Sequence, residues 1–379
     1  MPPESWFQIA LGEYAKVIMG QSPESDYYTT NPDDTPFLQG NRTFGSKYPT
    51  FDTFTSKVTK LASPGSVIVS VRAPVGDTNI AQVELCLGRG VAALSSDDPD
   101  NEFLYYLVKN LAPVLNQNEN GSTFGSINKS DLENLRLTLP DPESRIKIGR
   151  ILSSLDSKIE LNRVINDNLS EQGQAIFNEL IINGEPIGEV KLTDIAHFQN
   201  GLPMQKNRPI SGDGLPVLKI KELGQGHCDD TSERCREDID NSVTVNSGDV
   251  VFSWSGSLMA KIWCGGKCGL NQHLFKVTSE KYPLWFYYYW LQHYMPDFID
   301  IAANKATTMG HICRNHLEDA IIALPRPEVM KKTDSILSPI IRCQIKLMGE
   351  ITQLKTLRDY LLPKLMSDEI DVSTLEIPN

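Results

Sequence analysis

The sequence predicts an α/β (α+β) protein with two duplicated mixed α/β domains, separated by two long antiparallel coiled-coil helices in a pseudo-twofold arrangement. Three observations lead to this prediction. The chain has 379 residues, two to three times the usual size of a domain. One half of the sequence repeats the other, and each half ends in a stretch with apolar residues at helical spacing. The expected boundaries are 1–140 and 186–326 for the globular domains, 141–185 for a central helical spacer, and 327–379 for a C-terminal helical spacer and tail.

The repeat is clearest where each globular domain ends. Residues 123–140 (TFGSINKSDLENLRLTLP) align without a gap on residues 308–325 (TMGHICRNHLEDAIIALP), 185 positions later. The same offset brings residues 151–153 onto residues 336–338. Earlier pairs, such as 65–70 (GSVIVS) with 248–253 (GDVVFS), have offsets of 180 to 183, as expected where loops change length while the scaffold persists. The chain is therefore built from two copies of one unit.

Each copy begins with short β-rich runs between clusters of Gly, Pro, Asn and Ser. Examples are 67–71 (VIVSV) and 250–254 (VVFSW). One helix is expected in each copy, over 102–110 and 284–293, because apolar and aromatic residues crowd helical faces there. We expect the aromatic stretch 285–290 (WFYYYW) to pack in the core, and a base-stacking platform is the alternative.

Each copy ends in a long helix with an apolar stripe. Its apolar residues are mostly three, four or seven positions apart, a spacing typical of coiled coils. About forty helical residues span roughly 60 Å, too long for one side of a small domain. We therefore expect the two helices to pack on each other, antiparallel. The principal stripe residues are Ile148, Leu152, Leu155, Ile159, Leu169, Leu337, Ile341, Met348, Leu354 and Leu361.

Three positions interrupt these stripes. Asn162 lies where the spacing calls for an apolar residue, so it either fixes the helix register or faces another chain. At Ser338-Pro339 the second helix is expected either to start anew, with serine as the N-cap, or to kink. Pro363 is expected to close that helix.

Composition and charge narrow the functional classes. The formal net charge of −12 argues weakly against a nucleic-acid partner, because phosphate binding is normally carried by a basic surface, although a local basic face is compatible with it. No apolar run approaches the roughly 20 residues of a membrane span, and the start of the chain lacks the features of a secretory signal. Seven cysteines at irregular spacing do not suggest a disulfide framework. We expect a cytoplasmic protein in a reducing compartment, with no membrane partner.

Several motifs resemble one known family. They are residues 20–23 (GQSP), 70–76 (SVRAPVG), 86–90 (CLGRG) and 121–125 (GSTFG), and Leu139-Pro140 ahead of 151–160 (ILSSLDSKIE). With the duplication, they closely resemble the specificity (S) subunit of type I restriction-modification systems, the HsdS family, over nearly the whole chain. The resemblance is most specific in the first copy, because the second has 253–257 (SWSGS) where the arginine-containing motif stood.

The resemblance implies a DNA-binding subunit with no catalytic residues of its own. It implies two target recognition domains, each reading one half of an asymmetric bipartite site in double-stranded DNA. The helical spacers would set the unread gap and dock two modification subunits, which bind S-adenosylmethionine and methylate adenine, so the stripe residues become partner-docking positions. Restriction subunits that use ATP and Mg²⁺ can join. No metal and no cofactor is expected in this chain.

Candidate DNA-binding residues lie in the loops around these motifs. Gln and Asn can pair bidentately with adenine, and Arg with guanine. In the first copy the candidates are Gln21, Ser22, Gln39, Asn41, Arg42, Arg72, Arg89 and Thr123. In the second copy they are Gln205, Lys206, Lys219, Lys221, Trp254, Ser255, Asn271, Gln272, His273 and Lys305.

Missing motifs support a non-enzymatic subunit, and two alternatives stay open. The sequence has neither a GxxxxGK[ST] loop nor the Asn-Pro-Pro-aromatic tetrapeptide of adenine methyltransferases. Cys228, Cys235, Cys264 and Cys268 could supply four thiolates to a structural zinc ion, but their spacings are unusual and Cys268 aligns with Cys86 in a copy that lacks the others. The chain could also be a duplicated protein-assembly scaffold that does not read DNA, which the acidic balance permits.

Overall fold

The computed structural model describes residues 6–99, 101–117, 126–210, 214–304 and 310–375. The chain divides into two compact units. Unit 1 comprises Met1–Lys158 and Lys355–Asn379, and unit 2 comprises Ile159–Leu354. The boundary between the units crosses both long helices, so each unit contains one globular copy and part of each helix.

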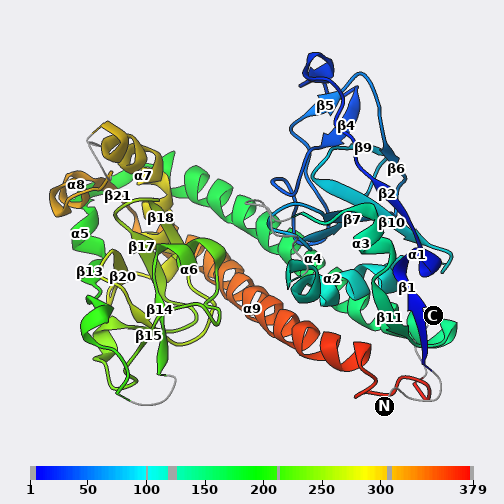
Figure 1. The fold of residues 1–379 in the computed structure, drawn as a ribbon. Helices are drawn as coiled ribbons and strands as arrows, with labels where there is room; N and C mark the ends of the chain where they lie inside the picture. The colour runs from blue at the N-terminus through cyan, green and yellow to red at the C-terminus, as the bar shows by residue number, and fades with distance from the viewer. Residues whose placement is uncertain (1–5, 100, 118–125, 211–213, 305–309, 376–379) are drawn as a thin grey trace. The chain divides into compact units, whose positions relative to one another are not determined.

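Unit 1 is a mixed α/β structure built on three small sheets (Figure 1). Their strand orders are β1-β11, β2-β10-β7-β8 and β3-β5-β4-β9-β6. The strands are β1 Phe7–Ala10, β2 Ala15–Met19, β3 Tyr28–Thr29, β4 Thr35–Leu38, β5 Phe54–Thr55, β6 Leu61–Ala62, β7 Val67–Ser70, β8 Thr78–Ile80, β9 Leu85–Leu87, β10 Val91–Ser96 and β11 Arg136–Leu139. The helices of this copy are α1 Leu11–Tyr14, α2 Glu102–Gln117 and α3 Lys129–Glu133.

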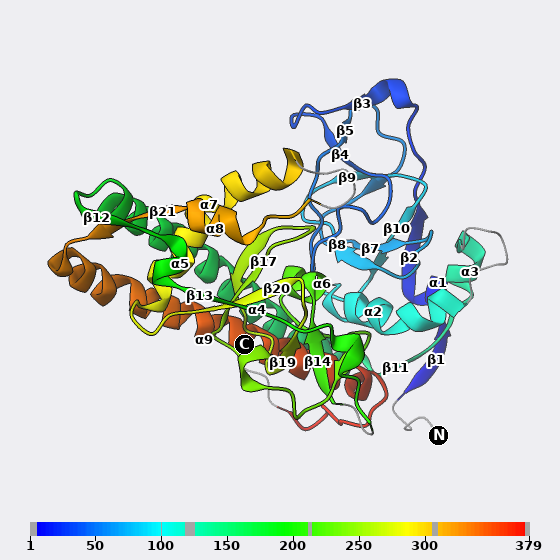
Figure 2. The same ribbon diagram turned by 90° about the vertical axis from the view of Figure 1, so that its left-hand side faces the viewer.

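Unit 2 repeats this topology except for β3, which has no counterpart among the described strands of unit 2. Its sheets have the orders β12-β21, β13-β20-β17-β18 and β15-β14-β19-β16. The strands are β12 Pro186–Lys191, β13 His197–Asn200, β14 Leu215–Leu218, β15 Arg234–Cys235, β16 Thr244–Val245, β17 Val250–Ser253, β18 Met259–Ile262, β19 Cys268–Leu270, β20 Leu274–Thr278 and β21 Ile321–Pro325. The helices are α5 Leu192–Ile195, α6 Ile220–Gln225, α7 Leu284–Asn304 and α8 Arg314–Asp319, and α7 packs against β18 (Figure 1). Figure 2 shows β17 and β20 of the same unit side by side. The predicted duplication and mixed α/β class are confirmed.

Strand register fixes which residues of the two copies correspond. In unit 1, β4 pairs parallel with β9, and Leu38 lies opposite Leu87. In unit 2, β14 pairs parallel with β19, and Leu218 lies opposite Leu270. Cys86 therefore corresponds to Gly269, and the expected alignment of Cys268 with Cys86 is wrong by one residue. The cause is the connection from β18 to β19, which is one residue longer than the connection from β8 to β9.

The main helix of each globular domain, α2 or α7, is longer than the sequence pattern indicated. Helix α2 continues past Asn110 through Pro113, and α7 continues past His293 through Pro296. A proline inside a helix removes one backbone hydrogen bond but need not end the helix where tertiary packing holds the next turn. Side chains beyond each proline are indeed buried, Leu115 in α2 and Phe298 in α7. The aromatic residues of α7 pack in the core of unit 2, as expected.

The long helices are α4, Pro142–Phe177, which continues into a π-helical turn at Asn178–Ile182, and α9, Pro327–Met366. They run antiparallel in both units. In unit 1, Asp156 of α4 pairs with Arg358 of α9, and in unit 2 Asn166 of α4 meets Gln344 of α9. Further toward the end of α4, Phe177 lies in the same buried cluster as Leu337, near the start of α9. The predicted antiparallel pair of helices is confirmed.

Helix α9 runs without a break through both of its prolines. Of the two alternatives at Ser338-Pro339, a new start is wrong, and so is the expected end at Pro363, because α9 extends from Pro327 to Met366. Leu337 and Ile341 are buried on either side of Pro339, and Leu362 and Leu365 on either side of Pro363. This packing holds the helix where the prolines remove backbone donors.

The apolar stripes face inward in the described structure. Ile148, Leu152, Ile159, Leu337 and Ile341 are buried, whereas Leu155, Leu169, Met348, Leu354 and Leu361 are half-buried. Asn162 is 0% exposed, so the alternative in which it faces another chain is wrong. No helix within the described ranges combines the length and apolar character needed to cross a membrane.

Candidate nucleic-acid interface

Three segments of unit 1 cross closely at the ends of β2, β4 and β9. The Gln21 amide donates to the Leu87 carbonyl (2.8 Å), and the Gly90 amide donates to the Gln39 carbonyl (2.9 Å). A Cβ on Gly88 would lie 2.6 Å from the Gln39 Cα, and one on Gly90 would lie 2.5 Å from the Gln39 carbonyl oxygen. The two glycines of the 86–90 motif are therefore required for the backbones to approach this closely. The crossing places the 20–23 and 86–90 motifs side by side.

Exposed polar side chains surround this crossing. Gln21, Gln39, Arg72 and Arg89 are exposed, and their side chains make no hydrogen bond or ion pair with other described residues. The Ser22 hydroxyl accepts from the Arg89 backbone amide (3.2 Å), which holds the two segments together. Five of the residues expected to bind DNA thus gather in one place, with two arginines and two glutamines free to contact a ligand.

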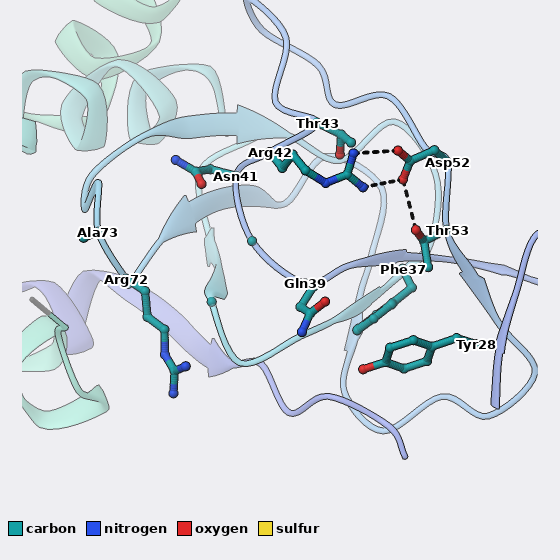
Figure 3. Close-up of a pocket in the computed structure, with 12 residues that line it drawn as sticks. Tyr28, Phe37, Gln39, Asn41, Arg42, Thr43, Asp52, Thr53, Arg72 and Ala73 are labelled. Carbon is teal, nitrogen blue, oxygen red and sulfur yellow. Dashed lines mark hydrogen bonds and ion pairs between the residues drawn. The ribbon is translucent and has the colours of Figure 1, made fainter. Parts of the chain in front are cut away.

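A pocket of about 420 Å³ opens between these loops (Figure 3). Gln39, Asn41, Arg42 and Arg72 line it, and the rings of Tyr28 and Phe37, 4.9 Å apart, form another part of its wall. Tyr28, Phe37 and Asp52 also line the pocket, and none of the three was among the site residues expected from the sequence. Two consecutive tyrosines at 27–28 could have indicated an aromatic site residue at Tyr28. Nothing in the sequence indicates Asp52, whose place at the pocket follows from its ion pair with Arg42.

Two of the expected DNA-binding residues that line the pocket are held by carboxylates. Both terminal nitrogens of Arg42 donate to Asp52 (2.7 and 2.8 Å), and the hydrogen bonds from Arg42 hold the pKa of the Asp52 carboxyl below its ordinary value. The Asn41 amide donates to Asp77 (2.6 Å). Because both pairs are exposed to solvent, they orient these side chains at the pocket without holding them strongly.

Unit 2 builds the same backbone crossing with other side chains. The Leu202 amide donates to the Leu270 carbonyl (2.9 Å), and the Asn271 amide donates to the Leu218 carbonyl (3.1 Å). Asn271 is 4% exposed, and its side-chain oxygen accepts from the His273 amide (3.2 Å), so it fixes the loop. Gln272 lies where unit 1 has Arg89, and Ser255 where it has Arg72.

An aromatic and histidine cluster occupies this part of unit 2. The Ser255 hydroxyl and His273 Nδ1 are 3.2 Å apart, and Gln272 Nε2 lies 3.4 Å from His273 Nε2. The Trp254 ring lies 5.8 Å from that of His273 and 6.4 Å from that of His311. His311 was not among the residues expected from the sequence. A backbone bridge to Ser255 brings it into this cluster.

The remaining candidates of the second copy are less concentrated. Lys219 pairs with Glu233, and Lys221 with Asp229 (3.6 Å), so both lysines are partly neutralised. Gln205 and Lys206 are exposed on the short turn at Met204–Lys206. Thr123 and Lys305 lie outside the described residues.

The cysteines are free thiols that do not assemble a metal site. Cys86, Cys235, Cys264 and Cys268 are buried, and Cys228 is half-buried. A hydrogen bond from Cys268 lowers the pKa of Cys228. No group of three or more His, Cys, Asp or Glu side chains within the described ranges could hold a metal ion, so the four-thiolate zinc set is not formed there.

The chain thus has two copies of one α/β domain, and both copies carry exposed loops at the same backbone crossing. The domains are linked through one pair of antiparallel helices, α4 and α9. This architecture defines a class of proteins with tandem binding domains. The profile of the type I restriction modification DNA specificity domain matches residues 3–171 and 185–356. The chain belongs to this family of type I restriction-modification specificity subunits.

Known relatives carry the same description. The type I restriction enzyme MjaX specificity subunit of Methanocaldococcus jannaschii is 38% identical over 183 residues, which cover 47% of this chain and 43% of that protein. The match therefore spans less than half of that relative. The MjaIX specificity subunit of the same organism is 25% identical over 98% of this chain and 95% of its own length. The crystal structure of a type I S subunit from M. genitalium shows the same fold, with a TM-score of 0.62 over 95% of this chain and 96% of that chain at 15% identity.

Proposed function

We propose that this chain is the non-catalytic subunit that gives a type I restriction-modification complex its DNA sequence specificity. Residues 1–140 and 186–326 are then two target recognition domains, each reading one half of a bipartite site in double-stranded DNA. The helices in 141–185 and 327–379 set the unread gap between the halves. The observation that carries the proposal is the backbone crossing present in both copies with different side chains at corresponding positions.

The side-chain differences predict an asymmetric site. Arg72 and Arg89 of the first copy are suited to bidentate contacts with guanine, whereas Ser255 and Gln272 at the same positions offer neutral groups. Two readers with one backbone and different side chains recognise different half-sites. Phosphate contacts position each domain, and base-edge contacts specify the sequence.

The helices are also the proposed docking surface for two modification subunits, which supply S-adenosylmethionine-dependent methylation, and two restriction subunits can join the complex in the cytoplasm. The buried stripe residues stabilise the helix pair itself. Exposed apolar residues on the same helices are better placed to contact a partner: Leu161, Val164 and Ile165 on α4, and Leu357 and Tyr360 on α9. Apolar side chains of this size on an exposed helix face are typical of an interaction surface.

Methylome sequencing of the host with and without this gene tests the proposal. We expect loss of adenine methylation at one asymmetric bipartite sequence when the gene is deleted. A gel-shift assay of the chain with its co-expressed modification subunit, at stated salt, should show a matching preference. A chain that assembles with the modification subunit but shows no sequence preference would instead be a protein-assembly scaffold.

A further inference from the structure

In unit 1, three helices meet at a buried ion pair. The Tyr106 hydroxyl of α2 donates to Asp156 of α4 (2.6 Å), and the Arg358 guanidinium of α9 donates to the other oxygen of Asp156 (2.6 Å). The side chains of Asp156 and Arg358 are only 8% and 12% exposed. Lys109, one turn after Tyr106, lies close enough that burial and then the Arg358 charge lower its pKa. In unit 1, the space between α2, α4 and α9 is therefore occupied by Arg358 of the same chain.

Unit 2 lacks both ions at the corresponding place. An offset of 183 residues places Tyr289 where unit 1 has Tyr106, and the helix offset of 185 places Ile341 and Gly173 where it has Asp156 and Arg358. The burial pattern supports this correspondence, since Leu152 and its counterpart Leu337 are both 0% exposed. Neither the carboxylate nor the guanidinium of unit 1 has an equivalent.

Among the residues that the structure describes, the Tyr289 hydroxyl has no hydrogen-bond partner. Tyr289 is 1% exposed, and its hydroxyl makes no hydrogen bond with the described residues. It lies over Gly173, so that a Cβ on Gly173 would come within 1.9 Å of it. An unpaired buried hydroxyl costs free energy that a ligand bringing polar groups nearby could recover.

Beside this tyrosine, α4 and α7 leave an open pocket of about 490 Å³. Glu171, Gln174 and Ala175 line it from α4, and Tyr288 and Gln292 line it from α7. Gln292 is the counterpart of Lys109, and the exposed Glu171 carboxylate forms no ion pair with other described residues. At the rim, Asn178 begins the π-helical turn, a distortion that is frequent at functional sites.

We infer that this pocket binds an arginine side chain of a protein partner, which under the function proposed above is the modification subunit. A guanidinium only donates hydrogen bonds, and Glu171 supplies a carboxylate to accept them. Gln174 and Gln292 supply side-chain carbonyl oxygens, since their amide nitrogens already donate to Asn178 and to the Ala260 carbonyl. The tyrosine rings supply a face for stacking. In unit 1, Arg358 from within the chain supplies the guanidinium beside the corresponding tyrosine, where both groups bond to Asp156. The modification subunit therefore completes in unit 2 a contact that unit 1 makes by itself.

The affinity of the full-length chain for its modification subunit tests the inference. Glu171→Lys reverses the carboxylate, and Ala175→Trp fills the pocket from an exposed position. We expect each variant to weaken the association at least about tenfold, as for a central interface anchor. Glu280→Lys is the matched control, because Glu280 is exposed in unit 2 outside the pocket, and it should change affinity less than about twofold.

A small-molecule competition adds a chemical readout. L-arginine ethyl ester should weaken association of the wild-type chain more than L-lysine ethyl ester of the same charge, and Ala175→Trp should remove this difference. Wild-type affinity in both pocket variants, or equal effects of the two esters, would overturn the inference. If that happened while the complex still methylated a bipartite site, the proposed function would stand; if the wild-type chain bound no modification subunit, the proposed function itself would fall.

Discussion

The side chains at the tip of the unit 1 crossing should decide the first half-site. Gln39→Ala and Arg72→Ala remove exposed groups that make no side-chain hydrogen bond or ion pair with other described residues, so the fold should be unaffected. Each bidentate base contact contributes about 1–3 kcal/mol of discrimination, so we expect roughly a 5- to 150-fold loss of preference at one half-site and none at the other. Competitive gel shifts with half-site mutants measure this. Arg136→Ala, an exposed arginine on β11 away from the pocket, is the control. Loss at both halves would contradict independent readers.

The two buried tyrosines should respond differently to loss of their hydroxyls. Tyr106→Phe removes a hydrogen bond to the buried carboxylate of Asp156, which is worth about 1.5–3 kcal/mol. For a unit of this size that corresponds to a fall in melting temperature of roughly 3 to 12 °C. Tyr289→Phe removes a hydroxyl without a partner among the described residues, so its melting temperature should stay the same or rise. Equal losses in differential scanning calorimetry would mean that Tyr289 has a partner after all.

The reactivity of the thiols should follow burial. Burial raises the pKa of Cys264 to about 11, so the folded protein keeps this thiol neutral. Because the folded pKa lies above that of a free thiol near 8.5, the stabilisation from Cys264 is complete below that pH and disappears as the pH rises through 11. Iodoacetamide at pH 8 should therefore modify the exposed Cys313 and Cys343 and spare Cys264, as read by peptide mass spectrometry. Fast modification of Cys264 in the native protein would contradict this burial.

At the scale of single elements, the periodicity of apolar residues identified the helices but not their ends. Helices α2, α7 and α9 all continue through prolines at which a sequence pattern would stop, because buried residues on both sides hold the next turn. The loop residues expected to bind DNA were chosen for the hydrogen-bonding groups of Gln, Asn and Arg, which the sequence shows directly. Asp52 and His311 were not among them, because each is brought to its place by a contact that only the fold makes, with Arg42 and Ser255 respectively.

A substitution of Asn162 shows whether the pair of helices α4 and α9 is more stable with a polar or an apolar side chain at this position. The Asn162 side chain is 0% exposed, and neither its amide nitrogen nor its oxygen has a hydrogen-bond partner among the described residues. Asn162→Leu should stabilise the protein by about 1–3 kcal/mol, because it removes two unsatisfied buried atoms and adds apolar contacts. Urea unfolding measures the change. A loss of stability would show that the amide is satisfied and that its polar contact fixes the register.

At the scale of the whole molecule, the duplication made the architecture predictable because the offset of 185 residues linked the two long helices as copies. The consequence of having Gly173 in unit 2 where unit 1 has Arg358 could not be predicted from the sequence. It depends on tyrosines from two other helices and on which residues of antiparallel partners face each other. Such three-helix contacts have no local sequence signature, whereas strand and helix periodicity does.

The proposed spacing role of the helices predicts a change in the DNA gap when both are shortened together. Because Asp156 meets Arg358 and Asn166 meets Gln344, Ile159–Asn162 lies opposite Ile351–Leu354. Deleting both segments removes four residues from each helix, about 6 Å, which equals at most about two base pairs at 3.4 Å each. The two half-sites should remain the same while the gap shortens by roughly one to two base pairs, as read by methylome sequencing. Deleting Ile159–Asn162 alone is the matched control: it slides one helix past the other and should lower stability instead. An unchanged gap in a double deletion that still methylates DNA would show that the helices do not set the spacing.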